Sequence, residues 1–229
     1  MFTFFTIFYN KEKNMRRSLF LIVLLAVYVA VTVVHDASAA EEIRVWGGKV
    51  DDFKDSDGRI WHGGQNEKKE WGGWIEKLPR IAEVQNLTKD AEKLAKKEGY
   101  DKELFYAVSW ASFPDVVKVD LNTGKGTFNV TYLVGEHWSP NNRGFDIIIE
   151  DEIVEEEYVT PGNNEIDIIR YEGIEVKDKV MSLEFAGNPK TGAGDLNAMF
   201  SGIEVIPALA VDPKAKLTTT WGALKDNRQ

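Results

Sequence analysis

The fold is decided by the stretch VKVDLNTGKGTFNVTYLV, which occupies residues 117–134. Apolar and polar side chains alternate along residues 117–121 and again along residues 127–134, and Asn122-Thr123-Gly124 separates the two runs as a turn. Successive side chains of a β-strand point to opposite faces, so a period of two indicates one buried face and one wet face. The stretch therefore predicts two strands joined by a turn.

The same alternation recurs along much of the remaining chain, in residues 145–150, 165–168, 181–185 and 203–205. Several short alternating strands at close spacing are typical of antiparallel sandwiches and jelly rolls. We therefore expect an all-β fold, an antiparallel jelly-roll β-sandwich.

One segment departs from this pattern, because residues 88–98 consist largely of helix formers. Thr88 is suited to cap the N-terminus of a helix, Asp90 suits its first turn, and Gly99 is suited to end it. The sequence predicts one short surface helix in an insertion near residues 76–98.

The composition of the 229 residues excludes several classes of protein. The chain has no cysteine, which excludes a disulfide scaffold, Cys-ligated zinc and a thiol nucleophile. Its net charge of −9 argues against a nucleic-acid partner, which would need a basic surface. Tryptophan is unusually frequent, with seven residues, and the question is what these rings do.

The N-terminal segment has the features of a secretory signal. The apolar run at residues 18–34 follows four basic residues and precedes the small-residue site Ala37-Ser38-Ala39. We interpret residues 1–39 as a signal peptide whose true start is Met15, and we expect a secreted or otherwise extracytoplasmic protein (periplasm, cell surface or secretory-pathway lumen). An uncleaved signal anchor, which would leave the protein attached to a membrane, is the alternative.

Cleavage after Ala39 would leave one domain, residues 40–207, and a C-terminal tail, residues 208–229, in which the alternation is lost. Four basic and two acidic residues, of 28 and 37, would leave with the signal, so the remaining chain would carry a charge of −11. Without disulfides, such a domain depends on its apolar core.

Five segments, taken in order, resemble the malectin family of carbohydrate-binding domains: Ile43–Gly48 (IRVWGG), Asp55–Trp61 (DSDGRIW), Phe128–Glu136 (FNVTYLVGE), Asn142–Ile147 (NRGFDI) and Ser201–Val205 (SGIEV). They cover about residues 42–207. The resemblance implies a galactose-binding-like jelly roll, which agrees with the alternation. It also implies binding of a glycan, of the glucose-oligosaccharide type, through aromatic side chains and an acidic residue at loop tips.

The resemblance implies candidate carbohydrate-binding residues in several loops: Trp138 with the adjacent His137, Trp110, Trp71 and Trp74 beside Gly72-Gly73, and Asp195. This sequence departs from the family where a second aromatic would fall on Ser139, and the family position near Trp110 corresponds more closely to Ala111. These departures concern the choice of sugar more than the fold.

The chemistry of sugar binding fits these residue types. A tryptophan ring offers a flat plate to the apolar face of a pyranose, and a carboxylate accepts strong hydrogen bonds from hydroxyl groups. Trp138 lies in a polar loop after a buried strand, the usual context for a ligand contact on a rigid scaffold. Packing is the alternative for each ring, and a solvated turn is the alternative for Asp195. We assign Trp46 and Trp61 to structure.

Metal binding and glycosylation are weaker signals. Asp51, Asp52, Asp55 and Asp57 cluster, but an EF-hand would need Glu where Gly64 stands, so only a looser calcium cage stays open. We expect no cofactor. The acidic run from Glu150 to Glu157 suggests a solvated hairpin face. Glycosylation sequons begin at Asn86 and Asn129.

The sequence favours a binding module over an enzyme. It contains no G-x-S-x-G, H-E-x-x-H or P-loop motif. A glycan-cleaving jelly roll that uses two carboxylates is one alternative, since a chain so rich in acidic residues cannot exclude that pair. A surface adhesion domain that binds another protein through the same loops is the other.

Overall fold

The computed structural model describes residues 42–48, 51–63, 70–75 and 77–208. The predicted signal peptide with Met15, and residues 209–229 of the predicted tail with Trp221, lie outside the described residues. All elements discussed below belong to the compact unit Ala40–Gln229.

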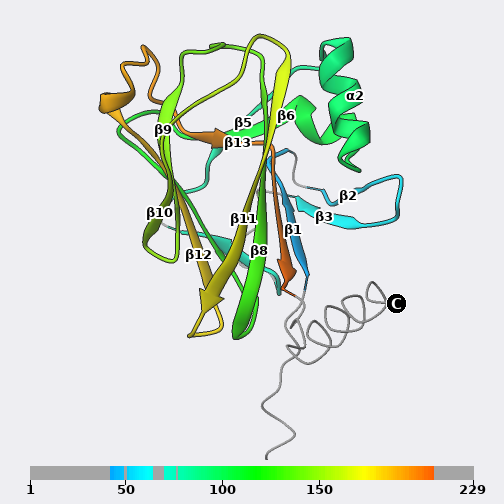
Figure 1. Ribbon diagram of the computed structural model, residues 1–229, viewed down its shortest axis with the longest axis vertical. Coiled ribbons are helices and arrows are strands. Elements are labelled where there is room, and N and C mark those ends of the chain that lie inside the picture. The colour runs from blue at the N-terminus through cyan, green and yellow to red at the C-terminus, as the bar shows by residue number, and fades with distance from the viewer. Residues whose placement is uncertain (1–41, 49–50, 64–69, 76, 209–229) are drawn as a thin grey trace, which may run out of the picture. The chain divides into compact units, whose positions relative to one another are not determined.

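Two large sheets and one small sheet form the domain (Figure 1). The first has the order β11 (Glu165–Val176), β8 (Gly126–Glu136), β14 (Gly202–Pro207), β1 (Ile43–Trp46), β3 (Ile60–Gly63), β2 (Phe53–Lys54). The second has the order β10 (Glu152–Val159), β9 (Gly144–Ile149), β12 (Met181–Gly187), β7 (Val117–Leu121), β4 (Gly72–Trp74). The small sheet has the order β13 (Met199–Phe200), β6 (Ala107–Trp110), β5 (Arg80–Glu83).

The predicted all-β sandwich is confirmed, and the strand pairs are antiparallel except for β1 with β3, which run parallel. The alternation read from the sequence appears as alternating burial in β7, β9 and β12. Their inward side chains, with those of β8 and β14, form the core between the two large sheets. Its largest members include Phe128, Tyr132, Phe145, Phe185 and Phe200.

Strand β8 loses its alternation after Val130, because both of its faces are covered. A second apolar cluster covers the outer face of the first sheet, where Leu133 of β8 packs with Trp61, Tyr100 and Phe105. These partners come from β3 and from the segment that contains α2 (Lys89–Lys97) and the 3-10 helix η1 (Lys102–Tyr106). The segment of residues 88–106, called the lid below, therefore covers this face of the sheet.

The predicted helix is confirmed at both ends. The Thr88 hydroxyl accepts a hydrogen bond from the Ala91 amide at 3.1 Å, and Gly99 beyond the last turn has a φ of +81°. Ala91 and Ala95 are buried, so the small side chains let α2 approach the sheet closely. The same insertion also contributes β5, which the sequence did not suggest.

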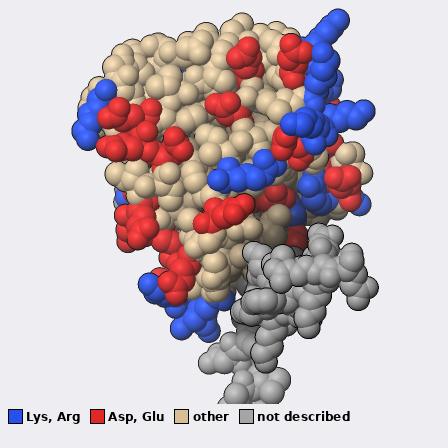
Figure 2. Space-filling view, viewed as in Figure 1, with Lys and Arg blue, Asp and Glu red and all other residues tan. Residues whose placement is uncertain are grey.

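Acidic and basic side chains are interspersed over the face drawn in Figure 2, and basic groups are prominent at its upper right, over α2. The acidic run forms the turn between β9 and β10 and most of β10, and its members at residues 151, 152, 156 and 157 are exposed. Within the described residues, no helix is long and apolar enough to cross a membrane.

Candidate functional site

The loop that follows β8 carries an exposed aromatic ring. This loop, residues 136–143, is called the Trp138 loop below. Trp138 is 38% exposed, whereas the other tryptophans that the structure describes are buried or half-buried. Pro140, Asn141 and Asn142 beside it are also exposed, so the ring lies among polar groups at one end of the sandwich.

A buried carboxylate holds the start of the Trp138 loop. Glu136 is 0% exposed, and its Oε1 accepts hydrogen bonds from the backbone amides of Trp138 at 2.8 Å and Ser139 at 2.9 Å. Its Oε2 accepts from Nε of Arg143 at 3.0 Å. Both oxygens are therefore used inside the protein, and the loop is fixed to the end of β8 by charge-assisted bonds.

The same arginine reaches a second carboxylate. Nη1 of Arg143 lies 2.8 Å from Oδ2 of Asp195, and Oδ1 of Asp195 accepts from the Asn197 amide at 2.9 Å. The backbones of Arg143 and Asp195 also form an isolated parallel bridge. Glu136, Arg143 and Asp195 are called the Glu136 network below. Asp195, which the sequence predicted to bind a sugar, thus has two partners within the protein.

His137 links the Trp138 loop to the lid. Its Nδ1 lies 2.9 Å from Oδ1 of Asn164, and its Nε2 lies 2.9 Å from the carbonyl oxygen of Phe105 in η1. Its ring meets Trp138 edge-on at 5.2 Å between centroids. Gly135 is required here, because a Cβ on it would collide with the Phe105 carbonyl. His137, Trp138 and Asp195 therefore belong to one assembly.

The structure places Trp71 and Trp74 elsewhere, in the core between the sheets, where they are 5% and 9% exposed. Trp74 packs on Phe200, and neither indole N–H has a hydrogen-bond partner among the residues that the structure describes. Gly72, one of the two glycines between them, serves strand packing, since a Cβ on it would collide with the backbone carbonyl of Asp120 in β7. This placement matches the packing alternative for both rings.

Trp110 is half-buried at the end of β6 and packs against the core. The guanidinium of Arg80 lies 5.1 Å from the centre of its ring, a cation–π contact that covers one face. Met199 of β13 pairs with Trp110 of β6, so the segment 195–199 runs from Asp195 of the Glu136 network to the strand beside Trp110. Trp110 is thus connected to the Trp138 loop through that segment.

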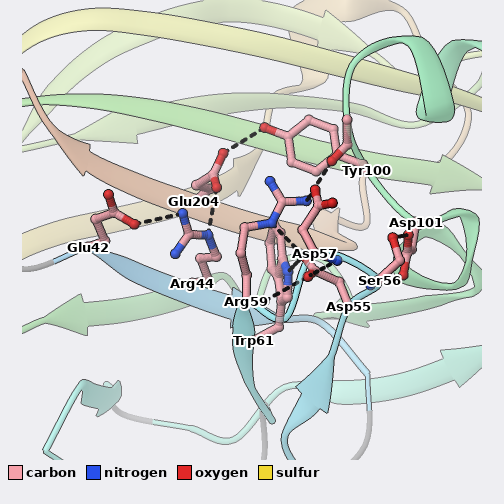
Figure 3. A network of polar contacts seen from close by, with 11 residues as sticks. Glu42, Arg44, Asp55, Ser56, Asp57, Arg59, Trp61, Tyr100, Asp101 and Glu204 are labelled. Atoms are coloured by element: carbon pink, nitrogen blue, oxygen red, sulfur yellow. Dashed lines mark hydrogen bonds and ion pairs between the residues drawn. The ribbon is translucent and has the colours of Figure 1, made fainter.

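A second polar cluster lies on the β1–β3 side of the first sheet (Figure 3). Asp55 is 5% exposed, and its carboxylate accepts from the indole N–H of Trp61 at 2.9 Å and from Nε of Arg59 at 2.6 Å. Burial raises the pKa of Asp55, but these bonds outweigh it and hold the pKa below its usual value. Trp61 is fully buried, as its structural assignment requires.

The cluster continues across the sheet, as Figure 3 shows. The Arg59 guanidinium lies over the ring of Tyr100, whose hydroxyl donates to Glu204 at 2.7 Å. Glu204 in turn accepts from Arg44 at 2.6 Å. Burial, followed by the Glu204 charge, raises the pKa of Tyr100 to about 12, so its hydroxyl keeps the proton that it donates. These residues are called the Asp55–Glu204 network below.

Some of the aspartates that could have formed a calcium cage are bonded to other groups of the protein. Asp55 bonds to Arg59 and Trp61, and Asp52 lies by His62 and the amide of Gly63. Among the residues that the structure describes, no group of three or more His, Cys, Asp or Glu side chains is placed to hold a metal ion.

Sequence reasoning did not assign a role to Glu136 or Arg143. Both stand in the segments Phe128–Glu136 and Asn142–Ile147 that carry the resemblance, and Glu136 ends a run of apolar residues. A carboxylate at the end of a buried strand is a signal of an internal partner. The partner itself could not be read, because Arg143 and Asp195 are 52 residues apart in sequence and meet only through the fold.

Comparison with known proteins identifies the fold. No family model and no curated protein sequence matches the chain. Among solved structures, the extracellular domain of ANXUR2 from Arabidopsis thaliana is similar, with a TM-score of 0.58 and 14% identity over 71% of this chain and 47% of that one. A complex of the plant peptide RALF23 with FER and LLG2 contains a similar chain, with a TM-score of 0.56, 16% identity and coverage of 71% and 47%.

A calcium binding mutant of Bacteroides uniformis beta-glucuronidase 2 is also similar, with a TM-score of 0.57 and 15% identity over 74% of this chain and 18% of that chain. The present chain spans less than half of each of these proteins. At such identities the likeness concerns the fold alone. That fold is a β-sandwich that occurs in plant receptor ectodomains and as one part of a larger glycosidase.

Proposed function

We propose that the chain is an exported, non-catalytic carbohydrate-binding domain that holds a neutral pyranose against the exposed ring of Trp138. The observation that carries the proposal is the position of this ring: it is exposed, on a loop whose backbone is fixed by a buried carboxylate. A fixed aromatic plate loses little entropy on binding. The resemblance to the malectin family supports a glycan ligand of glucose type, and the fold shared with an extracellular domain supports an extracytoplasmic location.

The charges around Trp138 favour binding over cleavage. A glycosidase needs two carboxyl groups that face the scissile bond. Glu136 and Asp195, the acids of the Trp138 assembly, are both engaged by Arg143, and Glu136 is inaccessible to solvent. Incubation with a panel of glucans tests this part of the proposal, and new reducing ends would refute it.

The binding test is a titration of the full chain with glucose oligosaccharides by calorimetry, after a glycan array has selected the ligand. Trp138→Ala should weaken binding by about 1–3 kcal/mol, the range for loss of an aromatic anchor, and should leave the melting temperature nearly unchanged. Ile153→Ala is the matched control, because Ile153 is 54% exposed and lies at the opposite end of β10 from the Trp138 loop. Unchanged affinity in a folded Trp138→Ala variant would remove Trp138 from the site.

A protein or peptide partner at the same end is the second candidate. Phe113 is 47% exposed, and its amide donates to Asn197, so a second apolar side chain is attached to the segment that carries Asp195. One of the similar chains occurs in a complex with the peptide RALF23. An array without glycan binding, together with a copurifying protein whose retention is lost in Trp138→Ala and in Phe113→Ala, would favour this candidate.

A further inference from the structure

We infer that Glu136 is the positioning residue of the Trp138 site, and that Arg143 and Asp195 act on the ligand through it. The inference rests on the proposed function of Trp138 and adds a second requirement to it: the ring binds well only while the Glu136 network fixes its backbone. It also assigns Asp195 a supporting role in place of direct contact with the sugar.

The contacts define a chain of support that runs inward from the loop. The backbone amides of Trp138 and Ser139 both donate to one oxygen of Glu136, at 2.8 and 2.9 Å. The other oxygen is held by Arg143 at 3.0 Å. Arg143 is 7% exposed and is held in turn by Asp195 at 2.8 Å. Each group thus has one partner nearer the ring and one farther from it.

Burial separates positioning from direct contact. Glu136 is 0% exposed, so no ligand at the surface can contact its carboxylate. Any effect of Glu136 on affinity must therefore pass through the groups that it holds, which are the loop amides and Arg143. Asp195 is more accessible, with 22% of its side chain exposed, but one oxygen holds Arg143 and the other holds the Asn197 amide.

The chain offers a closely matched control. Glu204 is also a buried carboxylate, 4% exposed, that is bonded to an arginine, Arg44, and to a second donor, Tyr100. It holds no part of the Trp138 loop. Glu136→Gln and Glu204→Gln therefore remove the same charge from similar surroundings. Only Glu136→Gln removes it from a carboxylate that holds the Trp138 loop.

The experiment measures hydrogen exchange of individual amides by NMR in the ¹⁵N-labelled full chain, without any ligand. Glu136→Gln should accelerate exchange at Trp138 and Ser139 about fivefold relative to other loop amides, because bonds to an ionised acceptor are roughly twice as strong as neutral ones. Glu204→Gln should leave these two amides unchanged. Asp195→Asn, which keeps the side-chain shape, should accelerate the same two amides by a smaller factor.

Three results would overturn the inference. The first is unchanged exchange at the two amides in Glu136→Gln, or in Asp195→Asn if Glu136→Gln does not fold. The second is equal acceleration in Glu204→Gln. The third is faster exchange with the wild-type affinity for the glycan that the array selects, where we expect about fivefold weaker binding. A wild-type chain that binds no glycan would refute the proposed function, and the exchange data would still decide whether Glu136 positions the loop.

Discussion

Arg44 and Arg143 each lie between two carboxylates, but the two arrangements support different parts of the molecule. Arg44 bonds to Glu42 and to Glu204, whose other oxygen is held by the buried Tyr100. Arg143 bonds to Asp195 and to Glu136, whose other oxygen is held by two backbone amides of an exposed loop. The chemistry is the same, and the difference lies in what the inner carboxylate supports.

Burial of a charged group therefore does not by itself reveal what the group supports. In the Asp55–Glu204 network the bonds join β1, β3, β14, the turn between β2 and β3, and the lid, so this network stabilises the sheet and its cover. In the Glu136 network the bonds close on a loop with an exposed ring. Substitutions in the first should therefore change stability alone, whereas substitutions in the second should also change the site.

The largest expected effect is that of Asp55→Ala. The variant would leave the Trp61 indole and the Arg59 guanidinium without their shared acceptor, and removal of one partner from a buried pair typically costs about 3–5 kcal/mol. The free energy of unfolding, measured with urea, should fall by about this amount. Asp57→Ala is the control, because the Asp57 side chain is 65% exposed and its ion pair with Arg59 should contribute little. Equal losses in both variants would contradict the structural role of Asp55.

Tyr100→Phe should have the next largest effect. It removes the hydroxyl that donates to Glu204, and a hydrogen bond to a charged acceptor contributes about 1.5–3 kcal/mol. Tyr171→Phe is a matched control, because the Tyr171 hydroxyl is buried and has no hydrogen-bond partner in the described part of the chain, so its removal should be neutral or stabilising. Calorimetric melting of both variants distinguishes the two tyrosines. A loss of glycan affinity in Tyr100→Phe would break the separation between the networks.

Thr88→Ala should cost about 1 kcal/mol of stability, since it removes the N-cap of α2. This change also tests whether the two regions are coupled, because the start of α2 contacts both. The Thr88 amide donates to the carbonyl oxygen of Asn164, and the Asn164 side chain lies by His137. Lys89→Ala, one residue further along, keeps the cap and is the control. Amide exchange at Trp138 that stays at the wild-type rate would show that the lid and the Trp138 loop are independent.

Much of the fold could be predicted, because the signals that define it are local. Alternation in residues 117–121 predicts a strand with one buried face and one wet face, and Thr88 with Gly99 predicts the ends of a helix from the chemistry of single turns. The lid was not visible as such, because burial of Leu133 on the outer face depends on what packs there.

The site was predicted only in part, for the same reason. Trp138 follows a recognisable strand, so its exposure at a loop was accessible to sequence reasoning. Asp195 was predicted to contact the sugar because it lies in a polar, glycine-rich loop. The sequence of that loop does not indicate that Arg143, which is distant in sequence, bonds to it. Trp71 and Trp74 were candidates beside Gly72-Gly73, and the group that lies against Gly72 is the backbone of β7.

The smallest expected effect is a dependence of the unfolding free energy on pH, and it is due to the carboxyl group of Asp55. The folded state holds the pKa of Asp55 below its value of 3.8 in the unfolded chain. Stability from this shift is therefore fully present above that value and is lost as the pH falls through the folded pKa. Asp55→Asn should be less stable than the wild type at neutral pH, and the difference between them should narrow as the pH falls below 3.8.

Asp57→Asn provides the reference, since an exposed carboxylate should give a small difference that changes little with pH. The unfolding free energies of the wild type and of both variants, measured between neutral pH and the onset of acid unfolding, decide the point. A constant gap for Asp55→Asn would mean that Asp55 acts through the shape of its hydrogen bonds rather than its charge. In that case the charge of Asp55 would be dispensable, and this part of the Asp55–Glu204 network would stabilise the protein through geometry alone.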